Sequence, residues 1–428
     1  MIRIIDGSDI NSIDKLLNRK TERDESIQQT VRGIVDNVRL RGINAALEYT
    51  EQFDRARLTP ETVEVTRDEI DDSYAQAGHA FADAVKRAAA NIHAYHEKQK
   101  RLTWMDFQPD RAMGQLILPI ERVGIYAPGG RAGYPSTVLM NAIPAKVAGV
   151  SEIVMVTPPG PDGRASYTAS LVAADIAGVD RIFKLGGAQA VAALAYGANP
   201  VPAVDKIVGP GNVYVQSAKR MVFGQVGLDS VAGPSEVLVI ADETARPDWV
   251  AADMLAQAEH DPDAAAMLVT TSRKLAEAVQ TAIAEQFRTR RRQQVLERSL
   301  ADNSAAVVVG SIDEAIALAN HVAPEHLELC VADPFGLLGK VRNAGAVFVG
   351  HYTPESAGDY YAGPNHVLPT NGTARFFSPL SVDDFTKKTS VLSFSQEALM
   401  ASTDDIETLA LAESLDAHAY AVTVRRGN

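Results

Sequence analysis

Hydrophobic residues recur at two different spacings along this chain, and the spacing changes near residue 121. Before that point, two charge-rich stretches at 26–53 and 67–101 carry apolar residues at helical spacing. After it, short β-type runs alternate with Ala-rich helical runs, as in Arg122-Val-Gly-Ile-Tyr followed by 137–150. Such alternation predicts βαβ units built around a parallel sheet.

The alternation occurs in two series, which predicts two sheets. Strands of the first series are expected at 122–126, 152–157, 181–185 and 205–208, and those of the second at 235–240, 266–271, 305–309 and 345–350. We therefore predict an α/β fold with two Rossmann-like, incompletely doubly wound domains and helical extensions at both ends. The expected division is an N-terminal segment over 1–25, a first α/β domain over 26–120 plus 235–377, a second over 121–234, and a C-terminal tail over 378–428.

Composition and charge narrow the class of partner. The 428 residues exceed what one hydrophobic core serves, and 46% hydrophobic with 22% charged residues is typical of globular proteins. A formal net charge of -13 repels phosphate backbones and anionic lipid, so nucleic acid and membrane surfaces are excluded as expected partners. No apolar run reaches the roughly 18 residues of a membrane helix, and the first residues lack a secretory signal. The expected location is the cytoplasm.

Three glycine-rich turns, 126–130, 186–189 and 209–212, each follow a predicted strand. In a parallel sheet such turns line the carboxyl edge, where glycine lets the backbone approach a pyrophosphate and a helix N-terminus favours negative charge. One such turn alone is an ordinary βα connection. Three in one domain, each with a hydrogen-bonding side chain at Tyr126, Gln189 or Asn212, favour a phosphate-bearing ligand. Neither the dinucleotide fingerprint nor the Walker loop is present, so these residues do not choose between NAD and another phosphate ligand.

Several residues of metal-ligand type lie in the second half of the chain. Gln257 and His260 are three apart at the end of a predicted helix and share a face, so they could offer an amide oxygen and an imidazole to one metal. The alternative is ordinary helix capping before Pro262. Asp359 and His366 lie in a loop punctuated by glycine and proline, which gives it a defined shape. His418, in contrast, stands alone in the C-terminal tail, where a histidine is usually a surface residue.

Glu325 and His326 are adjacent and can serve as two proton-transfer groups of different pKa. On a strand they would point to opposite faces, so we expect them in the turn between a helix and a strand. The alternative is a histidine packed beneath the start of that strand. Cys330 is the only cysteine, so no internal disulfide can form. It would lie about 13 Å from His326 along a strand and is expected to be a small core residue rather than a nucleophile.

Seven sequence motifs together carry a resemblance to a known family. They are Gly-Ile-Tyr-Ala-Pro-Gly-Gly, Gly-Gly-Ala-Gln-Ala, Lys-Ile-Val-Gly-Pro-Gly-Asn, Ala-Gly-Pro-Ser-Glu-Val-Leu-Val-Ile-Ala-Asp, Gln-Ala-Glu-His-Asp-Pro, Pro-Glu-His-Leu, and Ser-Ala-Gly-Asp-Tyr followed by Asn-His-Val-Leu-Pro-Thr. In this order the chain resembles histidinol dehydrogenases, and the match spans nearly its whole length.

The resemblance implies a cytoplasmic enzyme of histidine biosynthesis that oxidises L-histidinol through L-histidinal to L-histidine. It implies one Zn2+ per subunit, NAD as oxidant, and a homodimer whose tail completes a shared active site. By motif position the zinc ligands would be Gln257, His260, Asp359 and, from the partner subunit, His418. Glu325 and His326 match the catalytic pair, and Tyr126, Gln189 and Asn212 match the NAD contacts. Substrate contacts would come from Ser235, Gln257, His260, His326, Asp359, His366, Glu413 and His418.

Two other functions stay open at this point. A paralogous zinc- and NAD-dependent dehydrogenase could act on another small alcohol, such as a sulfonated diol, although Ser235, His366 and Glu413 favour a substrate bearing an amine and an imidazole. A protein of another class would bind a phosphate ligand through the glycine turns without catalysis, and it would hold no metal.

Overall fold

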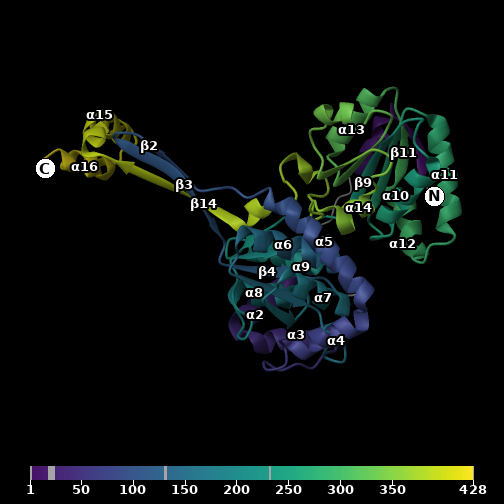
Figure 1. Ribbon diagram of the computed structural model, residues 1–428, viewed down its shortest axis with the longest axis horizontal. Coiled ribbons are helices and arrows are strands. Elements are labelled where there is room, and N and C mark those ends of the chain that lie inside the picture. The colour runs from purple at the N-terminus through teal and green to yellow at the C-terminus, as the bar shows by residue number, and fades with distance from the viewer. Residues whose placement is uncertain (1, 18–24, 130–132, 231–232, 428) are drawn as a thin grey trace. The chain divides into compact units, whose positions relative to one another are not determined.

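The computed structural model describes residues 2–17, 25–129, 133–230 and 233–427. Gly130, and residues 18–24 of the expected N-terminal segment, lie outside this range. The chain divides into a larger unit, Met1–Gln99 with Ile120–Phe385, and a smaller unit, Lys100–Pro119 with Thr386–Asn428. The larger unit contains two parallel sheets flanked by helices, which confirms the predicted α/β fold (Figure 1). Within the described residues, no helix combines the length and the apolarity needed to cross a membrane.

The six-stranded sheet has the order β1-β11-β10-β9-β12-β13, and every neighbouring pair is parallel. Its strands are β1 (Arg3–Asp6), β9 (Glu236–Ala241), β10 (Ala265–Thr270), β11 (Ala305–Val308), β12 (His326–Cys330) and β13 (Ala346–Val349). Central strands such as β9 are buried along their whole length, because helices cover both faces. One face packs on α10 (Pro247–Ala258), α11 (Arg273–Phe287) and α12 (Gln293–Arg298), and the other on α1 (Ile10–Leu17) and α13 (Ile312–Val322).

The five-stranded sheet has the order β6-β5-β4-β7-β8, again with parallel neighbours. Its strands are β4 (Arg122–Tyr126), β5 (Glu152–Thr157), β6 (Arg181–Lys184), β7 (Lys206–Val208) and β8 (Gly227–Leu228). The connecting helices are α6 (Pro135–Ala148), α7 (Thr168–Ala177), α8 (Gly187–Tyr196) and α9 (Val213–Val222). In both sheets the strand order reverses once, between β4 and β7 and between β9 and β12, which is the topology of doubly wound folds.

The helices between residues 25 and 97 pack differently from our expectation, which grouped 26–120 with 235–377. They are α2 (Glu25–Arg41), α3 (Ile43–Asp54), α4 (Arg67–Ala77) and α5 (His79–Glu97). Val31 and Val38 of α2 share a core with Phe183 of β6, and Val85 of α5 shares one with Ile125 of β4. They therefore belong with the 121–234 sheet, while β1 is the early segment that joins the other sheet. An apolar helix face shows that a helix is covered, but not which sheet covers it.

Glycine divides each of the two predicted N-terminal helical stretches. Gly42 separates α2 from α3 at φ 60°, and Gly78 separates α4 from α5 at φ 78°. Residues with a side chain rarely adopt such angles, so the helices end there. After Gly42 the chain turns, and both α2 and α3 place apolar residues against α8.

The smaller unit contains an antiparallel sheet that the sequence did not reveal. Its order is β14-β3-β2, from β14 (Thr386–Phe394), β3 (Arg111–Pro119) and β2 (Trp104–Phe107), with the helices α15 (Gln396–Ala412) and α16 (Asp416–Thr423) following in the chain. The C-terminal tail is thus helical only after Ser395. Most of β14 is exposed, so its sequence lacks the alternation of apolar residues that identifies a half-buried strand.

Candidate active site

The predicted catalytic pair lies at the amino end of the six-stranded sheet. His326 is the first residue of β12 and Glu325 directly precedes it, so the pair spans the turn and the strand start rather than the turn alone. The helix before them ends at Ala323 in the left-handed region, at φ 51°. Gly345 then pairs closely with the turn, because its N–H donates to the Pro324 carbonyl at 2.9 Å and a Cβ there would lie 2.5 Å from the Glu325 carbonyl oxygen. Any larger residue at 345 would displace the chain that carries the pair.

Both side chains of the pair contact the backbone of Glu236, the first residue of β9. The N–H of Glu236 donates to Glu325 Oε2 at 3.0 Å, and His326 Nδ1 lies 3.1 Å from the Glu236 carbonyl oxygen. Because a carbonyl only accepts hydrogen bonds, Nδ1 of His326 must carry the hydrogen and Nε2 must carry the lone pair. Nε2 is buried and has no hydrogen-bond partner among the described residues, which leaves it available to a ligand.

Burial controls the ionisation of the pair. Desolvation lowers the pKa of His326 to about 4, against a smaller opposite effect of Asp359. Desolvation also raises the pKa of Glu325 to about 8, although hydrogen bonds from the Ser235 side chain and the Glu236 backbone favour the carboxylate. At neutral pH the imidazole is therefore an uncharged base, and the carboxyl group gains or loses a proton near that pH. Ser235 is thus in direct contact with Glu325, while its role at the substrate site stays a prediction.

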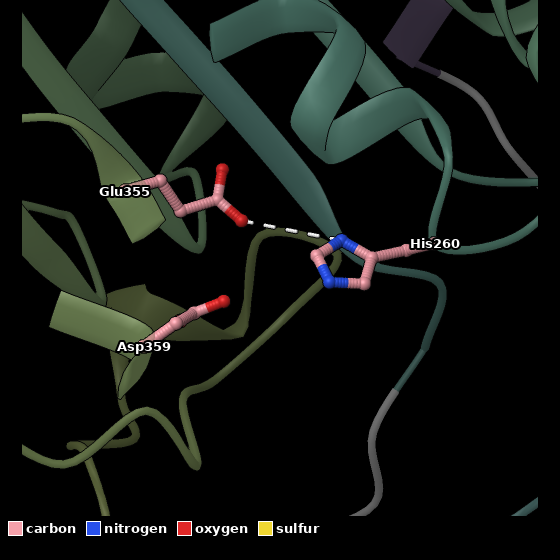
Figure 2. Close-up of side chains that lie close together, drawn as sticks. All are labelled: His260, Glu355 and Asp359. Atoms are coloured by element: carbon pink, nitrogen blue, oxygen red, sulfur yellow. Dashed lines mark ion pairs between the residues drawn. The ribbon is translucent and has the colours of Figure 1, made fainter. Parts of the chain in front are cut away.

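A cluster of metal-type donors lies beside the pair. His260, Glu355 and Asp359 each place one ligand atom within 4.8 Å of the others, and Figure 2 shows both carboxylates pointing toward the imidazole. Gln257 is fully buried next to them, with its amide 3.1 Å from His260 Nδ1. Imidazole, carboxylate and amide oxygen form a donor set that suits zinc, so these residues fit the metal. The structure thus brings together three of the four predicted ligands, Gln257, His260 and Asp359.

Glu355 is the member of this cluster that the sequence reasoning missed. It is buried and lies four residues before Asp359, a spacing that places two residues on one helical face. That spacing was the available signal. The segment between the two carries a short helix, α14 (Glu355–Ala357), and a further helical turn, Gly358–Ala362.

Asp359 is positioned by close packing of its loop. A Cβ at Gly358 would lie 2.6 Å from the Phe348 ring, so only glycine allows the turn to approach the ring this closely. The Phe348 ring also packs against the His326 ring, with centroids 5.8 Å apart. His366 also approaches Asp359, with its Nδ1 3.7 Å from Oδ1 of the carboxylate. Burial lowers the pKa of His366, so this imidazole is also held mainly in its neutral form.

The glycine turns lie at the carboxyl edge of the five-stranded sheet, as predicted. Tyr126 ends β4 and its hydroxyl oxygen accepts a hydrogen bond from the N–H of Gly187 at 3.0 Å. Gln189 is buried in the first turn of α8, and its Oε1 has no partner in the described chain. Asn212 caps α9 by accepting hydrogen bonds from the N–H groups of Tyr214 and Val215. The three residues thus end β4 or follow β6 and β7, and the strand order reverses between β4 and β7.

Two predicted site residues belong to the smaller unit. His418 lies in α16 and Glu413 directly follows α15, and both are exposed. Their roles in the site stay predictions. Cys330 is buried in the core of the six-stranded sheet, and burial raises the pKa of its thiol, which confirms the expected core position and disfavours a thiolate.

Fold and site together define an α/β enzyme in which a buried acid/base pair lies beside a cluster of metal-type donors. The chain belongs to the histidinol dehydrogenase family, whose model matches residues 17–426. It is 54% identical to histidinol dehydrogenase of Heliobacterium mobile over 99% of each chain. It is 53% identical to that of Geobacter metallireducens over 96% of this chain and 94% of the relative.

A solved structure agrees with this assignment. The crystal structure of histidinol dehydrogenase from Elizabethkingia anophelis superposes with a TM-score of 0.94 at 37% identity, covering 99% of this chain and 98% of the other. The family resemblance and the prediction of an enzyme are thereby confirmed, and the reading as a non-catalytic phosphate-binding protein is set aside.

Proposed function

We propose that this enzyme oxidises L-histidinol through L-histidinal to L-histidine, in the cytoplasm, with NAD as the oxidant and zinc at the donor cluster. The observation that carries the proposal is the uncharged Nε2 of His326, which is buried beside Glu325 and within 3.9 Å of Asp359 Oδ1 and has no hydrogen-bond partner in the described part of the chain. When bound, zinc would supply a positive charge that orients the nitrogen atoms of the substrate, and NAD would supply a hydride acceptor.

His326 and Glu325 each carry out a different part of the proton transfer. His326 accepts the proton of the substrate hydroxyl at Nε2, because Nδ1–H is occupied by the Glu236 carbonyl. Glu325, with a pKa near 8, takes a proton from the water that attacks the aldehyde. His326 releases the first proton to solvent, which its low pKa favours, and then accepts the remaining hydroxyl proton in the second oxidation. Gln257, His260 and Asp359 would hold the metal, and Ser235 and His366 would contact the substrate.

We assign the NAD-binding role to Tyr126, Gln189 and Asn212. The Tyr126 contact with Gly187 shapes the backbone before α8, and the buried Gln189 carbonyl oxygen is left to accept a hydrogen bond from a ligand. The amide nitrogen of Asn212 remains available at the N-terminus of α9, because only its oxygen caps the helix. Helix N-termini at this edge suit the negative charge of a pyrophosphate.

The smaller unit supports the proposed homodimer. Its exposed apolar residues include Leu102, Trp104, Phe107, Leu392, Leu409, Leu411 and Tyr420. So many apolar side chains on a small unit favour burial against another protein surface. Three ligands in the larger unit leave one tetrahedral position, which His418 of the partner subunit would fill. Glu413 would enter the substrate site with it.

The proposal is tested by measuring NADH formation with L-histidinol and with a panel of short diols, including sulfonated ones. We expect two NADH per histidine formed and no turnover of the diols. Activity on a diol with none on histidinol would refute the substrate assignment. Glu325→Gln should still reduce one NAD per histidinol and should slow the oxidation of supplied histidinal; equal loss in both steps would contradict the division of roles.

A further inference from the structure

Glu355 is buried in the middle of the site, yet none of the proposed steps uses it. Its side chain is 2% exposed, and its Oε1 lies 4.0 Å from His260 Nδ1 and 3.9 Å from His326 Nδ1. As a metal-type donor within 4.8 Å of the ligand atoms of His260 and Asp359, it has two possible roles. It either binds the metal directly or positions a residue that does.

The hydrogen bonds around Gln257 distinguish these roles. With its amide nitrogen directed toward Glu355, Gln257 donates at 3.0 and 3.1 Å to the two carboxylate oxygens, and its own oxygen faces His260 Nδ1 at 3.1 Å. The opposite orientation would direct the amide oxygen at a carboxylate. His326 Nδ1 cannot accept from the amide, because it donates to the Glu236 carbonyl. One N–H of the amide is therefore shared between the two Glu355 oxygens, which places the amide nitrogen on the Glu355 side.

Glu355 is itself held in place from two elements. Its backbone N–H donates to Glu328 Oε1 of β12 at 2.8 Å. Glu328 in turn hydrogen-bonds Asp253, which lies one turn before Gln257 on α10. The carboxylate that receives the Gln257 amide is thus connected through buried side chains to the same helix that carries Gln257.

We propose that Glu355 is a positioning residue that orients the Gln257 amide with its oxygen toward the metal and is not itself a ligand. The inference rests on the proposed metal site. An amide has a nitrogen and an oxygen of nearly equal size, and only the oxygen binds a divalent cation. The contact of the amide nitrogen with the Glu355 carboxylate removes that ambiguity. Groups that orient a ligand from outside the metal shell typically contribute 10–100-fold to metal affinity.

The test is a double-mutant cycle on zinc affinity, measured on the full-length protein by competition with a chromophoric chelator. We expect Glu355→Ala to weaken zinc binding about 10–100-fold and Glu355→Gln to weaken it less, since a glutamine oxygen still accepts one amide hydrogen. In a Gln257→Glu background the direction should change. There the amide that Glu355→Gln introduces can donate to the carboxylate at position 257, so the substitution leaves the zinc affinity unchanged or raises it.

A direct ligand would behave differently. If Glu355 bound the metal, Glu355→Gln would weaken zinc binding in both backgrounds, and the absorption spectrum of the cobalt-substituted protein would change with the donor set. Either result overturns the inference, as does an unchanged affinity in Glu355→Ala.

Glu259→Gln removes the same charge two residues from Gln257 and serves as the control. The Tm of each metal-free variant shows that it is folded. If the unmodified protein binds no zinc, the proposed metal site itself is refuted. The zinc affinity of the unmodified protein alone distinguishes this outcome from a failure of the Glu355 proposal.

Discussion

Replacing Glu325 by glutamine should change how the stability of the metal-free protein depends on pH. Burial raises the pKa of Glu325 from 4.5 to about 8, so ionising it in the folded protein costs about 5 kcal/mol more than in water. In the unfolded chain the same group ionises near its ordinary value. The folded state therefore binds a proton that the unfolded state has lost, and stability falls as pH rises between these two pKa values.

The expected magnitude follows from this difference. Between about pH 5 and about pH 9 the unmodified protein should lose about 4 kcal/mol that Glu325→Gln keeps, because the glutamine has no proton to lose. The assay is chemical unfolding of both proteins across this range, after removal of metal. Other groups titrate in both proteins, so the difference between the curves isolates Glu325.

Glu297→Gln provides the matched control, because Glu297 is exposed on α12 and the substitution removes the same charge. Its stability should follow the unmodified protein at every pH. Parallel curves for Glu325→Gln and the unmodified protein would refute the reasoning, since they would mean that the folded carboxyl group ionises as freely as in water.

Three further substitutions test other parts of the site. His326→Gln should lower kcat by about 10²- to 10⁴-fold in both oxidations with zinc content unchanged, measured by single-step kinetics and elemental analysis; loss of zinc would instead make His326 a ligand. Cys330→Ala should keep kcat/KM within about twofold and cost about 1 kcal/mol of stability, because it removes one buried atom; a loss of activity beyond about 10³-fold would reveal a reacting thiol. Asn212→Ala should remove the cap of α9, at about 1 kcal/mol, and raise the KM for NAD more than it lowers kcat; an unchanged KM would exclude Asn212 from the cofactor site.

The parts of the fold that the sequence predicted are those buried on both faces. Strands such as 152–157 and helices such as 273–287 were expected within a residue or two of their observed bounds, because their apolar residues recur at a clear period. β1 has only four residues, and β14 is largely exposed, so neither carries such a pattern. α2 packs against α8 and α9 of the five-stranded sheet rather than against the six-stranded sheet. That long-range choice depends on complementary surfaces, which a single sequence does not display.

The candidate site also contains residues that the sequence predicted and one that it missed. Gln257 and His260 were recognised because helical spacing places them on one face, and Glu325 with His326 because they are adjacent. Glu355 was missed because a single glutamate is ordinary in a surface segment, and its importance comes from burial. The pKa order of the pair also depends on burial and on the backbone of Glu236, which lies far away in the sequence.

Both members of the catalytic pair are held by main-chain atoms of Glu236, one by its N–H and one by its carbonyl. A scan that replaces side chains one at a time cannot remove either contact, so it would not measure what these two main-chain contacts contribute. Replacing the amide at 236 by an ester through chemical synthesis would delete the N–H donor to Glu325 alone. The side chain at 236 makes a separate contact, because it is buried and its Oε1 accepts a hydrogen bond from the N–H of Asn371 at 3.0 Å. A side-chain substitution at 236 therefore reports on that contact, whereas the ester reports on the main-chain support of the catalytic pair.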